Sequence, residues 1–148
     1  QSAWQQACDE AQPLAVILMD VDWFKDLNDQ YGHQAGDDCL RRIARILAQV
    51  PGNSQEIAAR YGGEEFVIVL LGLNGQEALA VAQSICKAIE KEGIPHNKGP
   101  AGAVTTLSAG VAFCYPTADM APEDLLKKAD AALYQAKANG RNNSVLAD

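Results

Sequence analysis

Two pairs of acidic residues are the groups in this sequence best suited to chemistry. Glu64 and Glu65 follow two glycines in the stretch Arg-Tyr-Gly-Gly-Glu-Glu-Phe at residues 60–66. Asp20 and Asp22 are separated by one residue at the end of an apolar run. Carboxylate oxygens are ligands that hard divalent cations prefer, and they also accept protons in general base catalysis. Both pairs are therefore candidates for directing negative charge into a reactive site.

The residues around the glycine pair predict a hairpin that holds both glutamates on a rigid turn. Apolar residues precede the pair at 57–59 and follow it at 66–71, as in two strands joined by a tight connection. Gly62 and Gly63 supply the positive φ that such a turn needs. A two-glycine hairpin is common, so this segment alone leaves open an exposed turn with incidental charge.

The aspartate pair follows the most apolar run near the start, residues 14–19, which has the length of a buried strand. A buried strand that ends in carboxylates is a usual way to place charge above an α/β sheet. Because side chains alternate along an extended chain, Asp20 and Asp22 should point to one side and Val21 to the other. For Asp22, helix capping or turn formation is an equal alternative.

Four motifs, in order, give the chain a specific resemblance to a known family. They are Asp-x-Asp-x-Phe-Lys-x-x-Asn-Asp at 20–29, Gly-His-x-x-Gly-Asp at 32–37, Gly-Gly-Glu-Glu-Phe at 62–66 and Ala-Asp-x-Ala-Leu-Tyr-x-Ala-Lys-x-x-Gly-Arg-Asn at 129–142. With these motifs the chain resembles the GGDEF family, the diguanylate cyclases that condense two GTP molecules into cyclic di-GMP. Glu64 stands where the family name has Asp, a variant that active members also use.

The resemblance implies a metal-assisted attack of a ribose 3′-hydroxyl on an α-phosphorus. Asp20, Glu64 and the carbonyl of Val21 would hold two Mg²⁺ ions, for which Mn²⁺ can substitute. Glu64 is also the implied proton acceptor, and Glu65 is the second candidate. Lys25 would stabilise the charge of the transition state, whereas without the resemblance it is more typical of a solvated helix residue.

The resemblance also implies how the guanine base is read. Asn28 and Asp37 would contact guanine, whose adjacent N1–H and N2–H donors match a carboxylate in a way that adenine cannot offer. Without the resemblance, Asn28 is a turn amide and Asp37 is the N-cap of a following helix. His33, in the same motif, is interpreted as a structural residue.

Phosphate contacts are implied at two places. The backbone amides around Trp23 and Phe24, at an expected helix start, suit phosphate oxygens. Lys137 and Arg141 would contact the β- and γ-phosphates, although both residues also have the position of cations that pair with a helix C-terminus.

Composition limits the function classes. A chain of 148 residues is the size of one domain, so residues 1–148 are expected to form a single catalytic domain. The net charge of −7 argues against nucleic-acid binding, which needs a basic face, while a triphosphate needs only a few local cations. No apolar run could span a bilayer, so a cytoplasmic catalytic domain without membrane contact is expected, in a full-length protein that could be anchored to a membrane elsewhere. Four widely spaced cysteines show no zinc pattern and favour free thiols.

The remaining pattern predicts an α+β fold with helices covering a mainly antiparallel central sheet. Helices are expected at 37–49, 76–92 and 122–139, a further strand at 104–113, and a possible short helix at 4–11. The resemblance adds a palm-like fold similar to that of class III nucleotide cyclases.

Partners follow from the resemblance as well. One site holds one GTP, so two domains should face each other as an antiparallel homodimer to form the cyclic product. A regulatory or sensory domain is expected in the full-length chain. Many family members carry an inhibitory Arg-x-x-Asp site before the signature, but residues 53–56 here are Asn-Ser-Gln-Glu, which predicts weak or absent product inhibition through it.

Three other functions are alternatives. A nucleotide receptor without activity should lack Asp20, Glu64 or Lys25, and all three are present. A relative that makes a mixed GMP–AMP dinucleotide typically has a smaller polar residue in place of Asp37. A protein-interaction domain would show no GTP turnover with Mg²⁺.

Overall fold

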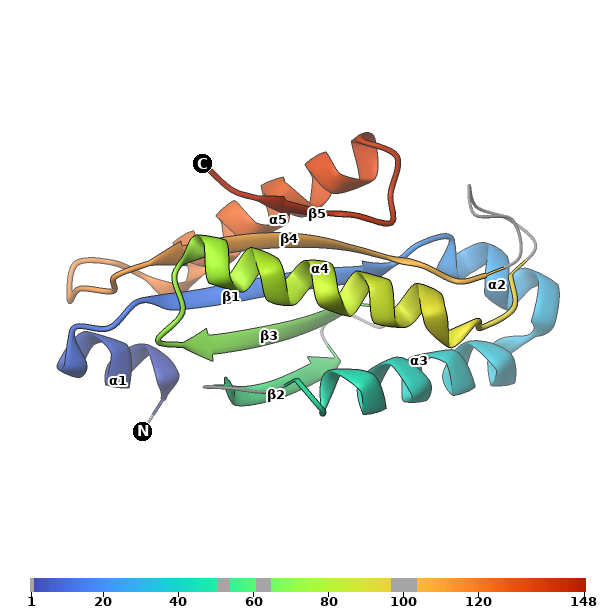
Figure 1. Cartoon of the computed structure of the whole chain (residues 1–148), viewed down its shortest axis with the longest axis horizontal. Helices are drawn as coiled ribbons and strands as arrows, with labels where there is room; N and C mark the ends of the chain where they lie inside the picture. Colours follow the sequence, from blue (N-terminus) through green and yellow to red (C-terminus); the bar gives the residue numbers. More distant parts are fainter. Residues whose placement is uncertain (1, 51–53, 61–64, 97–103) are drawn as a thin grey trace.

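The computed structural model describes residues 2–50, 54–60, 65–96 and 104–148, with the backbone alone for 54–60 (Figure 1). This part of the chain forms a five-stranded sheet of order β2-β3-β1-β4-β5. Its strands are β1 (Leu14–Val21), β2 (Ser54–Arg60), β3 (Glu65–Leu71), β4 (Leu107–Cys114) and β5 (Ser144–Leu146). Neighbouring strands are antiparallel except β4 and β5, which are parallel. The predicted mainly antiparallel sheet is thus confirmed.

Helices cover both faces of the sheet. They are α1 (Ala3–Glu10), α2 (Phe24–Tyr31), α3 (His33–Leu47), α4 (Gly75–Glu92) and α5 (Pro122–Ala138). In Figure 1, α4 crosses in front of the sheet and α5 lies behind it. No helix in the described ranges is long and apolar enough to cross a membrane.

Strand β1 is buried along its whole length because it supplies both apolar cores. Ile17 and Met19 belong to the core under α2, α3 and α4, whereas Val16 and Leu18 belong to the core under α1 and α5. This division follows from the two-residue period of a strand. The continuous apolar run at 14–19 therefore forms a buried strand, as predicted, and it is the middle strand of the sheet.

Helix α5 packs directly on β4 because Gly110 has no side chain. A methyl group at Gly110 would lie 2.2 Å from the carbonyl oxygen of Ala129 and 2.3 Å from the amide nitrogen of Leu133. Both atoms belong to the α5 backbone, so the helix cannot approach this closely over a larger residue. The close packing fixes the end of α5 relative to β1.

The predicted N-cap role of Asp37 is wrong. Helix α3 begins at His33, four residues earlier than expected, after Gly32 with a φ of 93°. Gly32 ends α2 and precedes α3, so the chain turns there between two helices. Asp37 is therefore an exposed residue inside α3 and is available for another role.

Other boundaries agree with the sequence to within a few residues. Asn74 and Glu77 form a capping box at the start of α4, and Gly93 ends it in the left-handed conformation. The hairpin strands pair antiparallel, with Arg60 opposite Phe66, while the predicted turn at 61–64 lies outside the described residues. The sequence did not predict β5, which has only three residues.

Candidate active site

Asp20 and Glu65 lie opposite each other on neighbouring strands. Asp20 is near the end of β1, and its antiparallel partner on β3 is Glu65. Directly opposed residues of this kind have Cβ atoms about 4.5–5.5 Å apart. The fold thus brings together two acidic groups that are 45 residues apart in the chain. Glu64 lies outside the described residues, so its assigned role stays a prediction.

The carboxylate of Asp20 is buried and only half satisfied. Its side chain pairs through Oδ2 with the ammonium group of Lys137, at the end of α5. Its other oxygen, Oδ1, is buried and has no hydrogen-bond partner among the described residues. A buried carboxylate oxygen without a partner is costly, and a divalent cation would satisfy it. Asp20 therefore fits the predicted role of a metal ligand.

The other proposed ligands lie next to Asp20 in the chain or outside the described part. Val21 ends β1 and offers a backbone carbonyl at the same strand end. In the described ranges, no group of three His, Cys, Asp or Glu residues could by itself hold a metal ion. A complete site at this strand end would thus need ligands that the described acidic, His and Cys side chains do not supply, such as the predicted Val21 carbonyl and Glu64.

Asp22 has a structural role, and the alternative of a helix cap is wrong. Its carboxylate accepts hydrogen bonds from Thr106 Oγ1 at 2.7 Å, Ser108 Oγ at 2.6 Å and the backbone N–H of Asn142 at 3.0 Å. The N-cap of α2 is Trp23, and no side chain caps that helix. Asp22 is only 2% exposed, so these donors replace the water that its charge has lost.

The residues predicted to meet phosphates surround the start of α2. Trp23 precedes the helix and Phe24 begins it, which points the first amides of α2 out of that end. Lys25 is exposed in the first turn. The guanidinium carbon of Arg141 lies 4.1 Å from the centre of the Trp23 ring. The structure therefore places Arg141 beside the predicted phosphate-binding amides.

Asn28, on α2, packs against α3 at Gly36, the residue before Asp37. A methyl group at Gly36 would lie 1.8 Å from Asn28 Oδ1, so the Asn28 side chain packs directly on the residue before Asp37. Asn28 Oδ1 is buried without a hydrogen-bond partner among the described residues. The structure thus places Asn28 against the residue next to Asp37, while reading of guanine by these two residues stays a prediction.

Sequence reasoning missed several residues that hold this site. They include His96, whose Nε2 lies 2.9 Å from the carbonyl oxygen of Trp23 and which is 1% exposed. Thr106 and Ser108 were also missed. Hydroxyl residues in an otherwise apolar strand were the available signal, because buried hydroxyls need a polar partner.

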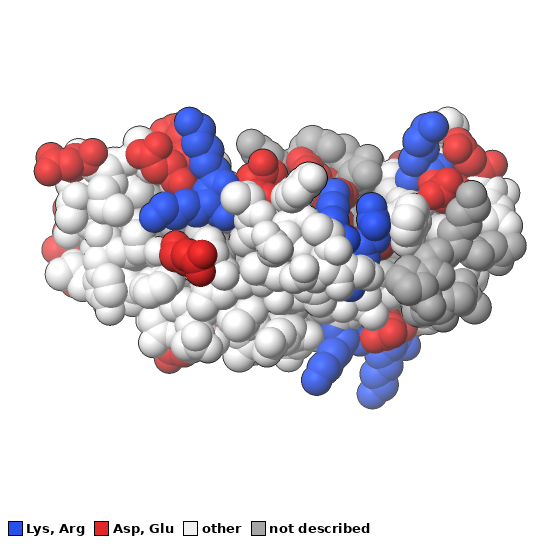
Figure 2. All heavy atoms as spheres, turned by 90° about the horizontal axis from the view of Figure 1, so that it is seen from above, with Lys and Arg blue, Asp and Glu red and all other residues white. Residues whose placement is uncertain are grey.

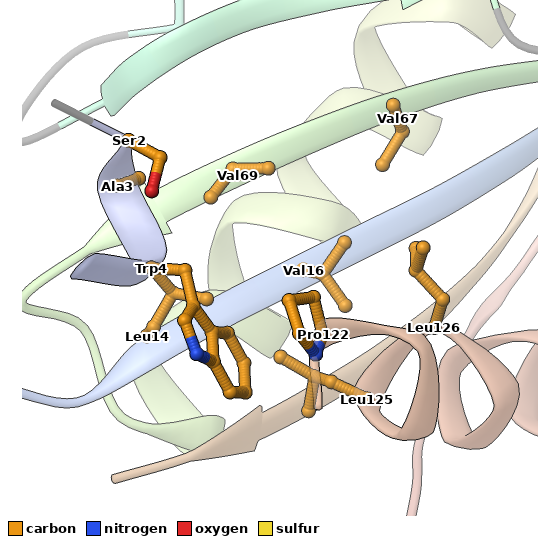
Figure 3. A pocket seen from close by; sticks show the side chains of 10 residues that line it. All are labelled: Ser2, Ala3, Trp4, Leu14, Val16, Val67, Val69, Pro122, Leu125 and Leu126. Carbon is orange, nitrogen blue, oxygen red and sulfur yellow. The ribbon is translucent and has the colours of Figure 1, made fainter. Parts of the chain in front are cut away.

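A cavity with apolar walls lies on the far side of β1 from α4, away from the acidic site (Figure 3). Its volume is about 350 Å³, and its walls come from α1, β1, β3 and the start of α5. Figure 3 shows Trp4, Val16, Val69 and Leu125 around it. Ser2 is the one polar residue among those that line it, so this cavity is unsuited to a triphosphate.

Charged side chains are interspersed on the face drawn in Figure 2. Basic and acidic groups lie next to one another in small clusters, with uncharged surface between them. In the described part of this face, basic side chains therefore lie in small mixed clusters and form no large basic patch.

Comparison of the sequence with known proteins finds diguanylate cyclases, in agreement with the resemblance seen in the motifs. A family model described as "Diguanylate cyclase, GGDEF domain" matches residues 1–143. Diguanylate cyclase A of Treponema denticola is 37% identical over 138 residues, which are 93% of this chain and 36% of that protein. Diguanylate cyclase DgcZ of Escherichia coli is 37% identical over 93% of this chain and 46% of its own length. The chain thus spans less than half of these curated relatives.

Solved structures share the fold. The active GGEEF domain of a diguanylate cyclase from Vibrio cholerae superimposes with a TM-score of 0.84 at 33% identity, covering 99% of this chain and 90% of that one. The GGDEF domain of DgcB from Caulobacter crescentus, solved with c-di-GMP, gives a TM-score of 0.84 at 28% identity, with 97% and 83% covered. The predicted palm-like cyclase fold is confirmed by these neighbours.

Proposed function

This chain belongs to the GGDEF family of diguanylate cyclases, and we propose on that premise that it condenses two GTP molecules into cyclic di-GMP and two pyrophosphates. The observation that carries the proposal is the convergence of Asp20, Glu65, Lys137 and the Trp23–Arg141 pair around the end of β1. The Vibrio cholerae domain, described as active, has the same Gly-Gly-Glu-Glu-Phe signature. A glutamate at position 64 is therefore compatible with activity.

Family members use metal ions, and we assign two Mg²⁺ ions to Asp20, the Val21 carbonyl and Glu64, with Mn²⁺ able to substitute. When bound, such ions neutralise the triphosphate and make a 3′-hydroxyl easier to deprotonate. Glu64 then accepts the proton of the hydroxyl, and Glu65 is the second candidate for this step. The unpartnered Oδ1 of Asp20 supports the assignment.

The chain's own cations and amides would bind the phosphates. The amides around Trp23 and Phe24 at the start of α2 face phosphate oxygens, and Lys25 adds a point charge in the same turn. Lys137 and Arg141 contact the β- and γ-phosphates. The ammonium group of Lys137 pairs with Asp20 in the structure. A metal ion bound to Asp20 would repel this ammonium group and favour its movement from the carboxylate to a phosphate.

Specificity for guanine would come from the α2–α3 crossing. Asp37 accepts from the N1–H and N2–H donors of guanine, and the Asn28 amide beside it completes the contact. Asp37 is exposed and does not cap α3, so its carboxylate is free for this role in the described structure. Adenine offers no such pair of donors, which is why we propose GTP as the substrate.

The cyclic product has two 3′–5′ bonds, so two copies would act together, each holding one GTP, as an antiparallel homodimer. The curated relatives are longer than this chain, and one that is 38% identical is a response regulator of Caulobacter vibrioides. We propose that the chain is a single catalytic domain whose pairing is controlled by other parts of a longer protein.

Incubation of the full chain with GTP and Mg²⁺ at high protein concentration tests the proposal. The expected product, identified by mass, is cyclic di-GMP, with pyrophosphate released in equal amount to the GTP consumed. Two controls are matched to the site: ATP in place of GTP, and Asp20→Asn in place of the wild type. Binding of GTP without any turnover would favour a receptor and contradict the proposal.

A further inference from the structure

Trp23 and Arg141 form a stacked pair built from two unusual backbone conformations. The guanidinium carbon of Arg141 is 4.1 Å from the Trp23 ring centre, and Trp23 is 36% exposed. Trp23 has a φ of 58° and Arg141 a φ of 63°, both in the left-handed region. Non-glycine residues in this region carry strain and persist only when surrounding contacts hold them.

Buried hydrogen bonds hold each side of the stack. The backbone carbonyl of Trp23 contacts Nε2 of His96 at 2.9 Å. On the other side, the N–H of Asn142, the residue after Arg141, donates to Asp22 at 3.0 Å. Because Asp22 directly precedes Trp23, one buried carboxylate ties the turn after α5 to the start of α2.

Further contacts fix the turn that carries Arg141. The N–H of Arg141 donates to the carbonyl of Ala136 at 3.1 Å. The Asn143 side-chain amide donates to the carbonyls of Ala136 and Arg141, both at 2.8 Å. Hydrogen bonds thus hold the backbone of Arg141 at several points. The Trp23 indole then orients the Arg141 side chain.

Stacking leaves the hydrogen-bonding capacity of the arginine available. A guanidinium group is planar, attracts an aromatic ring through its face and donates hydrogen bonds from its edge. Arg141 can therefore lie on Trp23 and at the same time donate to phosphate oxygens. A side chain ordered before binding loses less conformational entropy when the ligand arrives.

We propose that the Trp23 indole is a positioning residue, which holds the Arg141 guanidinium for the β- and γ-phosphates of the bound nucleoside triphosphate. This inference rests on the proposed function and adds a side-chain role to the residue whose backbone amide was assigned to phosphate binding. It predicts that the contribution of the indole to binding depends on Arg141.

A double-mutant cycle on the full chain tests this dependence. The probe is a non-hydrolysable GTP analogue, with an α,β-methylene bridge, bound with Mg²⁺ and measured by calorimetry. Trp23→Leu should weaken binding about two- to fivefold, the scale of a partly exposed cation–π contact. In the Arg141→Ala background the same substitution should have no further effect. Trp23→Tyr keeps an aromatic face and should restore most of the affinity.

A structural role for Trp23 would give a different pattern. Equal losses from Trp23→Leu in both backgrounds, or full loss in Trp23→Tyr, would overturn the inference. GMP serves as the matched ligand, because it lacks the β- and γ-phosphates, and its affinity should be unchanged by Trp23→Leu. A loss of GMP affinity equal to the loss for the triphosphate would also overturn it.

The stack can be measured without any nucleotide. The chain has two tryptophans, so Trp4→Phe leaves Trp23 as the sole indole. Adding Arg141→Ala to that variant should shift the indole fluorescence, because a cation leaves the ring face. Identical spectra would overturn the inference even for an active enzyme. The binding cycle and the spectral shift could also give the expected results while no cyclic product forms. That outcome would reject the proposed catalysis and support the positioning role of Trp23.

Discussion

Asp20 and Asp22 are two residues apart and both buried, but their partners give them different roles. Three neutral donors satisfy Asp22, whereas Asp20 has one cationic partner and one oxygen without any partner in the described structure. A fully bonded carboxylate stabilises the fold, and an incompletely bonded one can accept a cation. At the scale of single residues, hydrogen-bond satisfaction thus separates the structural aspartate from the candidate ligand.

Glu64→Gln should reduce turnover of GTP by orders of magnitude while the fold is kept. The amide has nearly the same shape but lacks both the anionic ligand and the proton acceptor. The rate of cyclic di-GMP formation measures the effect, and circular dichroism checks the fold. Glu123→Gln, an exposed residue in the first turn of α5, is the control and should keep its activity. Wild-type turnover in Glu64→Gln would reject the assigned role.

Asp37→Ser should lower the preference for GTP over ATP by roughly 1–3 kcal/mol, the cost of leaving buried donors unpaired. Competition between the two nucleotides in the wild type and the variant measures the ratio. Asp38→Ser is the matched control, since Asp38 is exposed and pairs with Arg41 on the surface of α3. An unchanged ratio in Asp37→Ser would show that Asp37 does not read the base.

At the scale of elements, the position of α5 depends on close contact with β4. Lys137 lies in its last turn and Arg141 just after it, so both cations move with this helix. Gly110 allows the contact, because a side chain there would meet the α5 backbone. The packing of one helix on one strand thus sets the distance between these cations and the end of β1.

Gly110→Ala should destabilise the fold by at least about 1–3 kcal/mol, as overpacking does, and should lower activity further because α5 must move. Urea denaturation measures the free energy of unfolding. Gly75→Ala is the contrasting variant: its new methyl group would meet the Phe113 ring at 2.7 Å, and this side chain is 37% exposed and can turn away. Equal destabilisation by the two substitutions would contradict the proposed backbone contact.

The position of the family's inhibitory site, residues 53–56, overlaps the start of β2. Asn53 lies outside the described residues, and the backbone of Glu56 pairs with Val69. Asparagine cannot supply the charged, two-pronged contact of an arginine to a phosphate. Titration of cyclic di-GMP by calorimetry should therefore show weak or no binding there. Tight binding that disappears in Glu56→Ala would contradict this prediction.

At the scale of the whole molecule, the sheet separates two apolar cores, and the candidate site lies at one end of the strand they share. The buried thiols Cys39 and Cys86 belong to the core under α2, α3 and α4. Burial raises the pKa of each from 9.0 to about 11. Both are therefore protonated in the folded protein at neutral pH, which makes them poor nucleophiles.

The free energy of unfolding should fall as the pH rises from 9 towards 11. Below pH 9 both thiols are protonated in the folded and unfolded states, so their stabilisation is fully present. Above it, the unfolded chain releases protons that the folded chain keeps, which favours unfolding. Denaturation at several pH values measures this slope, and Cys39→Ala with Cys86→Ala should flatten it. An equally steep slope in the double variant would assign the effect to other groups.

The sequence alone determined most of the elements and the main chemical groups. The buried strand at 14–19, the extents of α4 and α5 and the acidic pairs are local patterns, and each depends on residues within a few positions. Local hydrogen bonds and the period of apolar residues act over one or two turns. For that reason these features could be predicted without knowledge of the fold.

Tertiary structure decided which of these groups meet. Asp22 bonds to Thr106 and Asn142, which are 84 and 120 residues away, and His96 reaches Trp23 across 73 residues. The start of α3 depended on the turn at Gly32, and the three-residue β5 depended on its pairing with β4. Contacts between distant segments arise from packing, in which any buried polar group must find whichever partner the fold brings near. No local pattern in the chain specifies that partner.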